Sequence, residues 1–135
     1  RLTTIAILLI FASCSDDSDS PSKMSFTEQN AGSWYGPVDI PGSDSIDYWI
    51  VLDKAGNLFE WNGEYDGQCG EMKRSRITVV KNTPEEFIFT TSEGNFSAVW
   101  TMTNSGSKIN VVLEVESLSI DFVISSDSDC YSIVG

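Results

Sequence analysis

The chain has 135 residues, of which 8 are basic and 20 are acidic, so its formal net charge is -12, and it contains no histidine. Its length suits a single domain with short extensions, and its charge disfavours a nucleic-acid partner, because phosphate backbones are themselves negative. The lack of histidine excludes Ser-His-Asp and Cys-His catalytic sites and imidazole ligands for metals.

The first residues have the pattern of a secretory signal. Arg1 is followed by an apolar run over residues 5–12 and then by small residues, which is the order of a basic end, a short apolar segment and a cleavage zone. This run is shorter than the roughly 18 residues of a membrane-spanning helix. The sequence Phe11-Ala12-Ser13-Cys14 resembles a bacterial lipobox. The resemblance implies that residues 1–13 are removed and that Cys14 carries the lipid, with a plain secretory signal as the alternative.

The stretch after Cys14 is rich in Ser and Asp, and we expect residues 14–29 to form a flexible acidic tether, because the residues next to Cys14 offer no apolar side chain for burial. Ser15, Asp16 and Asp17 resemble the export signal of lipoproteins from Bacteroidetes. The resemblance implies a lipid-anchored outer-membrane protein exposed at the cell surface, with the periplasmic face as the alternative location.

From residue 46 onward, apolar and polar residues alternate with the period of two that is typical of β-strands. Parallel pairing is not expected, because it needs a crossover of a dozen or more residues, usually a helix. Roughly eight or nine strands joined by short turns predict an all-β, up-and-down antiparallel barrel, with a β-sandwich as the alternative. The expected strands cover residues 46–53, 58–62, 76–80, 86–91, 96–103, 108–116, 118–124 and 130–134.

Two stretches resemble lipocalins and the lipocalin-like lipoproteins of Bacteroidetes. Gly32-Ser33-Trp34 is similar to their Gly-x-Trp opening, and residues 49–59 are similar to their second repeat of aromatic, apolar, Asp-x-x-Gly and aromatic positions. The resemblance implies that residues 30–135 form a lipocalin-like barrel in which Trp34 closes one end and packs on the first strand.

Three cysteines are present. If Cys14 carries lipid, Cys69 and Cys130 remain, which is an even number for an oxidising compartment. We therefore expect a disulfide between Cys69 and Cys130, which would stabilise the fold by about 4 kcal/mol in the chain-entropy model. Two independent thiols are the alternative.

Aromatic residues concentrate in the first half of the chain, and they allow two interpretations. They could form an open barrel mouth or a stacking platform for a small apolar ligand or a glycan. Alternatively they fill the barrel, as side chains fill other small barrels, which is the interpretation the sequence favours. In that case Trp34, Trp49, Phe59 and Trp61 lie inside, and Tyr48, on the face opposite Trp49, is the exposed aromatic. The candidate ligand-binding residues are Trp34, Tyr35, Tyr48, Trp49, Trp61 and Tyr65.

A basic cluster stands out in this acidic chain. It could recognise an anion or a carboxylate. The favoured interpretation is a polar outer face on which these cations pair with carboxylates such as Glu85 or Glu86. The cluster consists of Lys73, Arg74, Arg76 and Lys81.

Asp44-Ser45-Ile46 is similar to the O-glycosylation triplet of Bacteroidetes, which would place a glycan on Ser45 in a surface turn.

These features predict a surface-anchored lipoprotein that acts as a binding or interaction module for a small apolar ligand, a glycan or an envelope protein. A proteinaceous inhibitor or immunity factor of the lysozyme-inhibitor type is one alternative, and an accessory subunit of an outer-membrane uptake or adhesion system is another. A ligand-sized pocket would favour the first function, and a solid core with protruding polar loops would favour the inhibitor. We expect no enzyme activity, no metal and no cofactor, and no nucleic-acid partner.

Overall fold

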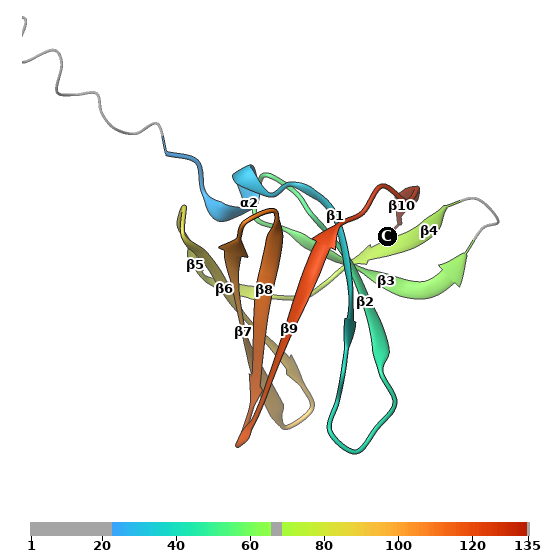
Figure 1. Ribbon diagram of the computed structural model, residues 1–135, viewed down its shortest axis with the longest axis vertical. Coiled ribbons are helices and arrows are strands. Elements are labelled where there is room, and N and C mark those ends of the chain that lie inside the picture. Colours follow the sequence, from blue (N-terminus) through green and yellow to red (C-terminus); the bar gives the residue numbers. More distant parts are fainter. Residues whose placement is uncertain (1–22, 66–68, 135) are drawn as a thin grey trace, which may run out of the picture.

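The computed structural model describes residues 23–65 and 69–134 (Figure 1). This part of the chain forms one ten-stranded, mostly antiparallel sheet with one short helix, which confirms the predicted all-β fold. The elements are α2 (Phe26–Gln29), β1 (Gly32–Val38), β2 (Ile46–Leu52), β3 (Leu58–Tyr65), β4 (Gly70–Arg74), β5 (Thr78–Asn82), β6 (Glu86–Glu93), β7 (Phe96–Ser105), β8 (Lys108–Val115), β9 (Leu118–Ser126) and β10 (Tyr131–Val134).

The sheet consists of two meanders joined side by side. Its strand order is β10-β4-β3-β2-β1-β9-β8-β7-β6-β5, so β1 to β4 form one meander and β5 to β9 form the other. The two are joined where β9 pairs with β1, at Trp34 and Ser126. The edge strands β10 and β5 are not paired with each other, so the sheet is not closed. Strands β4 and β5 follow each other in the chain but are not paired either. We call this junction between β4 and β5, bridged by residues 75–77, the seam.

The expectation of purely antiparallel pairing is wrong at one edge. Strand β10 runs parallel to β4, with Tyr131 opposite Gly70. A parallel pair needs a long connection, and here the five strands β5 to β9 provide it in place of a crossover helix. Strand β4 was also not predicted, because its short run of alternating residues is interrupted by charges at Glu71, Lys73 and Arg74.

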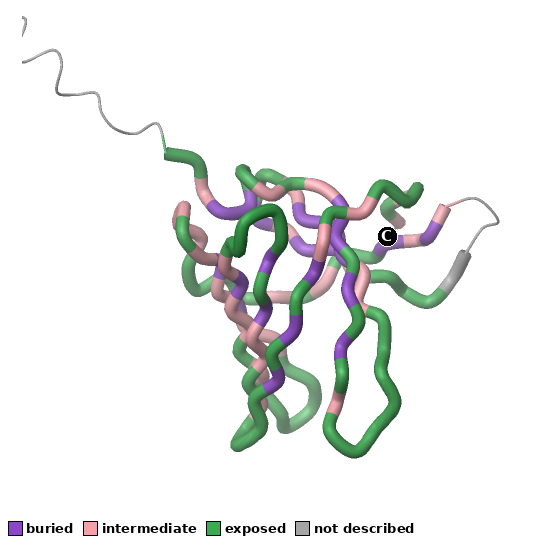
Figure 2. Tube along the Cα trace, in the orientation of Figure 1, coloured by how far each residue is buried: buried purple, intermediate pink, exposed green. Residues whose placement is uncertain are grey.

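One face of the sheet, which we call the inner face, encloses the main core. Strands of both meanders contribute to this single cluster, so the sheet must bend around it (Figure 1). Buried and exposed positions alternate along β8 and β9, as Figure 2 shows. The buried members of the cluster are Phe26, Trp34, Val38, Ile50, Leu52, Leu58, Phe87, Phe89, Met102, Ile109, Val111, Ile120, Phe122 and Ile124.

Helix α2 belongs to the folded domain. A capping box starts it, in which the Glu28 amide donates to Ser25 Oγ and the Ser25 amide donates to Glu28 Oε1. The fully buried Phe26 ring stacks on Phe87, with centroids 6.4 Å apart. The tether was expected to extend to residue 29, but Phe26 is buried in the main core, so the folded domain begins before that residue. The boundary was missed because Phe26 is a single apolar residue outside the alternating pattern of the strands.

A second, smaller cluster lies on the opposite face, which we call the outer face. It consists of Val51, Phe59 and Met72, with Trp49 packed against it. The interpretation that Trp49, Phe59 and Trp61 fill the inside of the fold together with Trp34 is therefore wrong, because only Trp34 belongs to the main core.

The predicted disulfide between Cys69 and Cys130 is present. It closes a sequence separation of 61 residues, and the Gly70 amide donates to the Cys130 carbonyl oxygen at 3.0 Å. The bond therefore joins the starts of β4 and β10.

The lipobox with Cys14 and the export signal Ser15-Asp16-Asp17 lie outside the described residues. Within the described ranges, no helix is long and apolar enough to cross a membrane.

Candidate functional site

The structure divides the candidate ligand-binding aromatics between the two faces of the sheet. Trp34 and Tyr48 face the main core, whereas Tyr35 and Trp49 are cross-strand partners on the outer face. Strand residues point alternately to opposite faces, so the pairing of β1 with β2 sets this division. Tyr65 ends β3 and pairs with Gly70 in the ladder.

The outer face carries a row of apolar side chains that crosses the strands, and we call it the aromatic face. Tyr35 lies opposite Trp49, Trp61 lies opposite Met72, and Met72 lies opposite Ile133. The rings of Trp49 and Trp61 have centroids 6.3 Å apart. Three members remain open to solvent, since Tyr35 is 41%, Trp61 43% and Ile133 50% exposed.

The rings of the aromatic face are held by neighbours. The indole N–H of Trp49 donates to Ser33 Oγ at 2.7 Å. A Cβ at Gly70 would collide with the Trp49 ring, so a glycine is needed beneath it. The Tyr35 hydroxyl donates to Asp47 Oδ1 at 2.8 Å, and this bond to a carboxylate raises the pKa of Tyr35. The aromatic face is therefore a pre-ordered surface.

The inner face is occupied by stacked rings. Tyr48 stacks on Trp100 at 5.5 Å and contacts Phe122 edge-on at 5.4 Å, while Trp100 stacks on Phe89 at 5.7 Å. The Trp100 indole N–H donates to Thr91 Oγ1 at 2.9 Å. These stacked rings occupy the part of the inner face around Tyr48.

Tyr48 is not the exposed aromatic that the sequence predicted. Its hydroxyl is buried and has no hydrogen-bond partner among the described residues. Burial raises the pKa of Tyr48 well above its usual range, and the negative charge of Glu60 adds to this effect. The exposed aromatics of this region are instead Tyr35 and Trp61.

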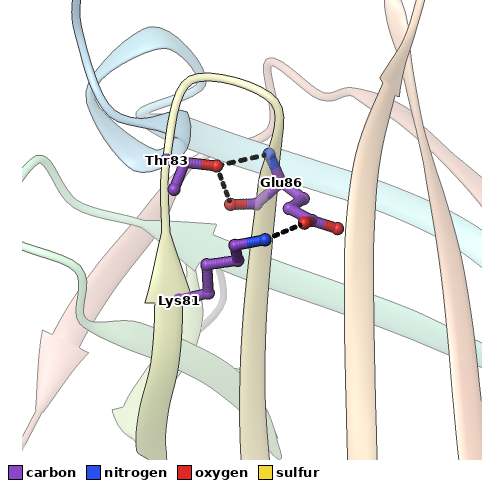
Figure 3. Close-up of polar contacts among 3 residues, drawn as sticks. All are labelled: Lys81, Thr83 and Glu86. Atoms are coloured by element: carbon purple, nitrogen blue, oxygen red, sulfur yellow. Dashed lines mark hydrogen bonds and ion pairs between the residues drawn. The ribbon is translucent and has the colours of Figure 1, made fainter.

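The basic cluster separates into two parts. Lys81 forms an ion pair with Glu86 at 2.6 Å across the β5–β6 hairpin (Figure 3), which also raises the pKa of Lys81. The favoured interpretation of paired cations is confirmed for this residue. Among the residues whose side chains the structure describes, 23–63 and 69–134, Lys73, Arg74 and Arg76 form no ion pair.

These three cations line a cleft of about 530 Å³ at the seam, which we call the seam cleft. The Arg74 guanidinium donates from Nη2 to Asn57 Oδ1 at 2.7 Å. The Ser75 amide donates to the Leu58 carbonyl oxygen at 2.9 Å, which fixes the start of the bridging segment beside β3. The lining residues are Gly56, Asn57, Lys73, Arg74, Ser75, Arg76, Ile77 and Val79.

Ser45 lies in the exposed loop between β1 and β2, and its hydroxyl donates to the Val38 carbonyl oxygen at 3.4 Å. Its glycosylation stays a prediction.

Sequence reasoning missed one part of the aromatic face. Ile133 could not be placed beside Met72, because the parallel pairing of β10 leaves no local signal in the sequence.

The described residues include no group of three or more His, Cys, Asp or Glu side chains that could hold a metal ion. The chain matches no protein-family model, no curated protein and no solved structure.

Proposed function

We propose that the protein is a non-catalytic binding module that recognises a glycan through the aromatic face. The observation that carries this proposal is the exposure of Tyr35 and Trp61 on either side of the anchored Trp49. Rigid aromatic rings supply a large contact area at low entropic cost. The C–H face of a sugar ring stacks on such rings while its hydroxyl groups stay hydrated.

Two features favour a glycan over a small apolar ligand. Apolar ligands are enclosed in concave pockets that bury most of their surface, whereas the inner face is filled by the stacked rings of Tyr48, Trp100 and Phe89. The aromatic face instead crosses β1 to β4 and β10 as an open row with polar neighbours such as Asp47. An extended, amphipathic chain of sugars fits such a surface.

The test compares Trp61→Ala with Phe96→Ala. Phe96 is a matched control, because it is 56% exposed and begins β7, in the other meander. Affinities for a panel of oligosaccharides are measured by calorimetry. We expect Trp61→Ala to weaken binding about tenfold or more, which corresponds to about 1.4 kcal/mol, and Trp61→Phe to restore part of the affinity. Equal losses in the Ala variants, or no binding to any oligosaccharide, would contradict the proposal.

We also propose that the module is a lipocalin-like barrel, open at the seam, of a lipoprotein anchored at Cys14 to the outer membrane and displayed on the cell surface. The lipobox and the Ser15-Asp16-Asp17 signal support the anchor, and the two meanders joined at β1 and β9 support the architecture. Intact-mass analysis should find a chain that begins with an acylated Cys14. External protease should shave the protein from intact cells, and full protection would refute surface display.

A second candidate function is inhibition of a secreted enzyme of the lysozyme type. The filled inner face and the exposed, protruding hairpin loop over residues 39–45 favour it (Figure 2). Inhibition of lysozyme by the purified protein, lost when this loop is replaced by a short Asn-Gly turn, would support this function. The same assay without inhibition would remove it. An accessory role beside an outer-membrane protein predicts instead that such a protein co-purifies from solubilised membranes.

A further inference from the structure

We propose that the glycan is acidic and that the seam cleft binds its carboxylate or sulfate group. This inference rests on the function proposed for the aromatic face. It concerns Lys73, Arg74 and Arg76, the cations that line the cleft at the open junction of the sheet.

The charge of the seam cleft is opposite to that of the protein. The chain has only 8 basic residues against 20 acidic ones, yet three of the basic residues line this cleft, and none of the described residues that line it is acidic. Like charges that line one cleft repel each other, and an anion bound between them offsets this repulsion. Lys81, outside the cleft, differs from these cations because it is paired with Glu86.

Arg74 is prepared for an anion. A guanidinium has five N–H donors, and the bond to Asn57 Oδ1 uses one of them and fixes the orientation of the group. The planar fork that remains suits the two oxygens of a carboxylate or a sulfate. The seam cleft, at about 530 Å³, lies within the usual range for small-ligand sites.

Arg74 also connects the seam cleft to the aromatic face. It lies two residues after Met72 on β4, and its cross-strand partner Phe59 lies two residues before Trp61 on β3. Since alternate residues of a strand share a face, Arg74 and Trp61 are both on the outer face. The step between alternate residues is about 7 Å. A sugar stacked on Trp61 can therefore place an acidic substituent, or an acidic neighbouring sugar, at Arg74.

The proposal differs from a general attraction of anions to a basic surface. The protein as a whole is negative, so long-range electrostatics disfavour acidic ligands, and affinity must come from direct contacts in the seam cleft. The strength of direct contacts depends on where each charged side chain lies relative to the bound anion. Removing one charge inside the cleft should have a larger effect than removing one outside it.

The experiment titrates the full chain with two matched pairs of oligosaccharides. Oligogalacturonate is compared with its methyl ester, which masks the carboxylates. Chondroitin sulfate is compared with desulfated chondroitin, which keeps its carboxylates, so this second pair tests the sulfate alone. The variants are Arg74→Gln and Arg76→Gln, with Lys81→Gln as a control that removes the same charge outside the lining of the cleft. Circular dichroism and thermal melting check that each variant folds.

We expect the wild type to bind at least one acidic oligosaccharide about tenfold more tightly than its masked counterpart. Arg74→Gln should remove this preference and leave affinity for the uncharged methyl ester unchanged, while Lys81→Gln should retain the preference. The preferred member of each pair identifies the carboxylate or the sulfate as the recognised group.

Three outcomes overturn the inference in distinguishable ways. If masked and acidic sugars bind equally and Trp61→Ala weakens both, the aromatic face binds glycans and the seam cleft plays no part. If Arg74→Gln and Lys81→Gln reduce binding equally, the effect is general electrostatics, and the inference is again wrong. If no sugar binds to the wild type, the proposed function fails, and the inference fails with it.

Discussion

Strands β8 and β9 are buried on one face, whereas β2 and β3 are buried on both faces where they meet. In β9, buried Ile120, Phe122 and Ile124 alternate with exposed residues. In β2, the consecutive residues Ile50, Val51 and Leu52 are all buried. The difference shows that the second meander provides one side of a core. The first meander contributes to that core and also carries the outer cluster on which the aromatic face is built.

Each meander has one register shift, and both lie in ladders near an edge of the sheet. The β3–β4 ladder shifts between Trp61 and Tyr65, and the β5–β6 ladder shifts between Val79 and Lys81, whereas the ladders from β6 to β9 run without interruption. The disulfide joins the end of the irregular part of β3–β4 to β10. We therefore expect the second meander to determine global stability and the edge formed by β3, β4 and β10 to open locally.

The largest expected effect comes from the main core. Phe87 on β6 is fully buried and contacts both Phe26 and Phe89. Phe87→Ala should lower the free energy of unfolding by about 3–5 kcal/mol, because it removes a ring and leaves a cavity. Denaturant unfolding measures the change. The control Val99→Ala, at a residue 37% exposed on β7, should change it by less than about 0.5 kcal/mol. Similar losses in the two variants would show that the second meander does not provide the core.

The disulfide gives the next largest effect. Replacing Cys69 and Cys130 together by Ser should lower the free energy of unfolding by about 4 kcal/mol in the chain-entropy model. Hydrogen exchange should accelerate first in β4 and β10, which start at the bond, while β7 and β8 stay protected. A reducing agent should have the same effect on the wild type and none on the double variant. Uniform acceleration over all strands would contradict the expected local opening.

Alternation predicted the strands of the second meander well, because each has one wet face and one buried face. The expected strand over residues 108–116 corresponds to β8, for example. A strand covered on both faces reads instead as a continuous apolar run. The run from Trp49 to Leu52 therefore predicts a strand without telling which side faces the main core. For this reason the sequence placed Trp49 inside and Tyr48 outside, opposite to the structure.

The sequence predicts that basic residues cluster in this region, but it does not predict which of them form ion pairs. Lys81 and Glu86 lie on the two arms of one hairpin, and such a pair can be inferred from the sequence. Lys73 and Arg74 lie on β4, whose neighbours are β3 and β10 rather than β5. Lys73 and Arg74 therefore form no ion pair with Glu85 or Glu86 despite their proximity in the sequence, because β4 does not pair with β5 or β6.

A smaller change, this time an increase in the free energy of unfolding, is expected for a substitution on the inner face of the first meander but not for one on its outer face. Tyr48→Phe removes a buried hydroxyl that lacks a partner in the described part of the chain and keeps the ring contacts with Trp100 and Phe122. It should raise the free energy of unfolding by about 1 kcal/mol, since an unsatisfied buried polar group is costly. The matched control Tyr35→Phe removes a hydroxyl that donates to Asp47, and it should give no gain. Denaturant unfolding at neutral pH compares the two.

The buried Tyr48 hydroxyl also makes the stability of the protein depend on pH in the alkaline range. An unfolded tyrosine loses its proton near pH 10, whereas burial raises the pKa of Tyr48 well above that value in the folded protein. Below about pH 10 the hydroxyl is protonated in both states, so its ionisation does not affect stability. Above it, only the unfolded chain loses this proton, and stability falls as pH rises toward the folded pKa. Tyr48→Phe should therefore flatten the alkaline loss of stability, measured as the denaturation midpoint from pH 9 upward (about one unit below the unfolded pKa). An alkaline limb identical to that of the wild type would mean that the Tyr48 hydroxyl reaches water and that the inner face is less completely filled than its stacked rings indicate.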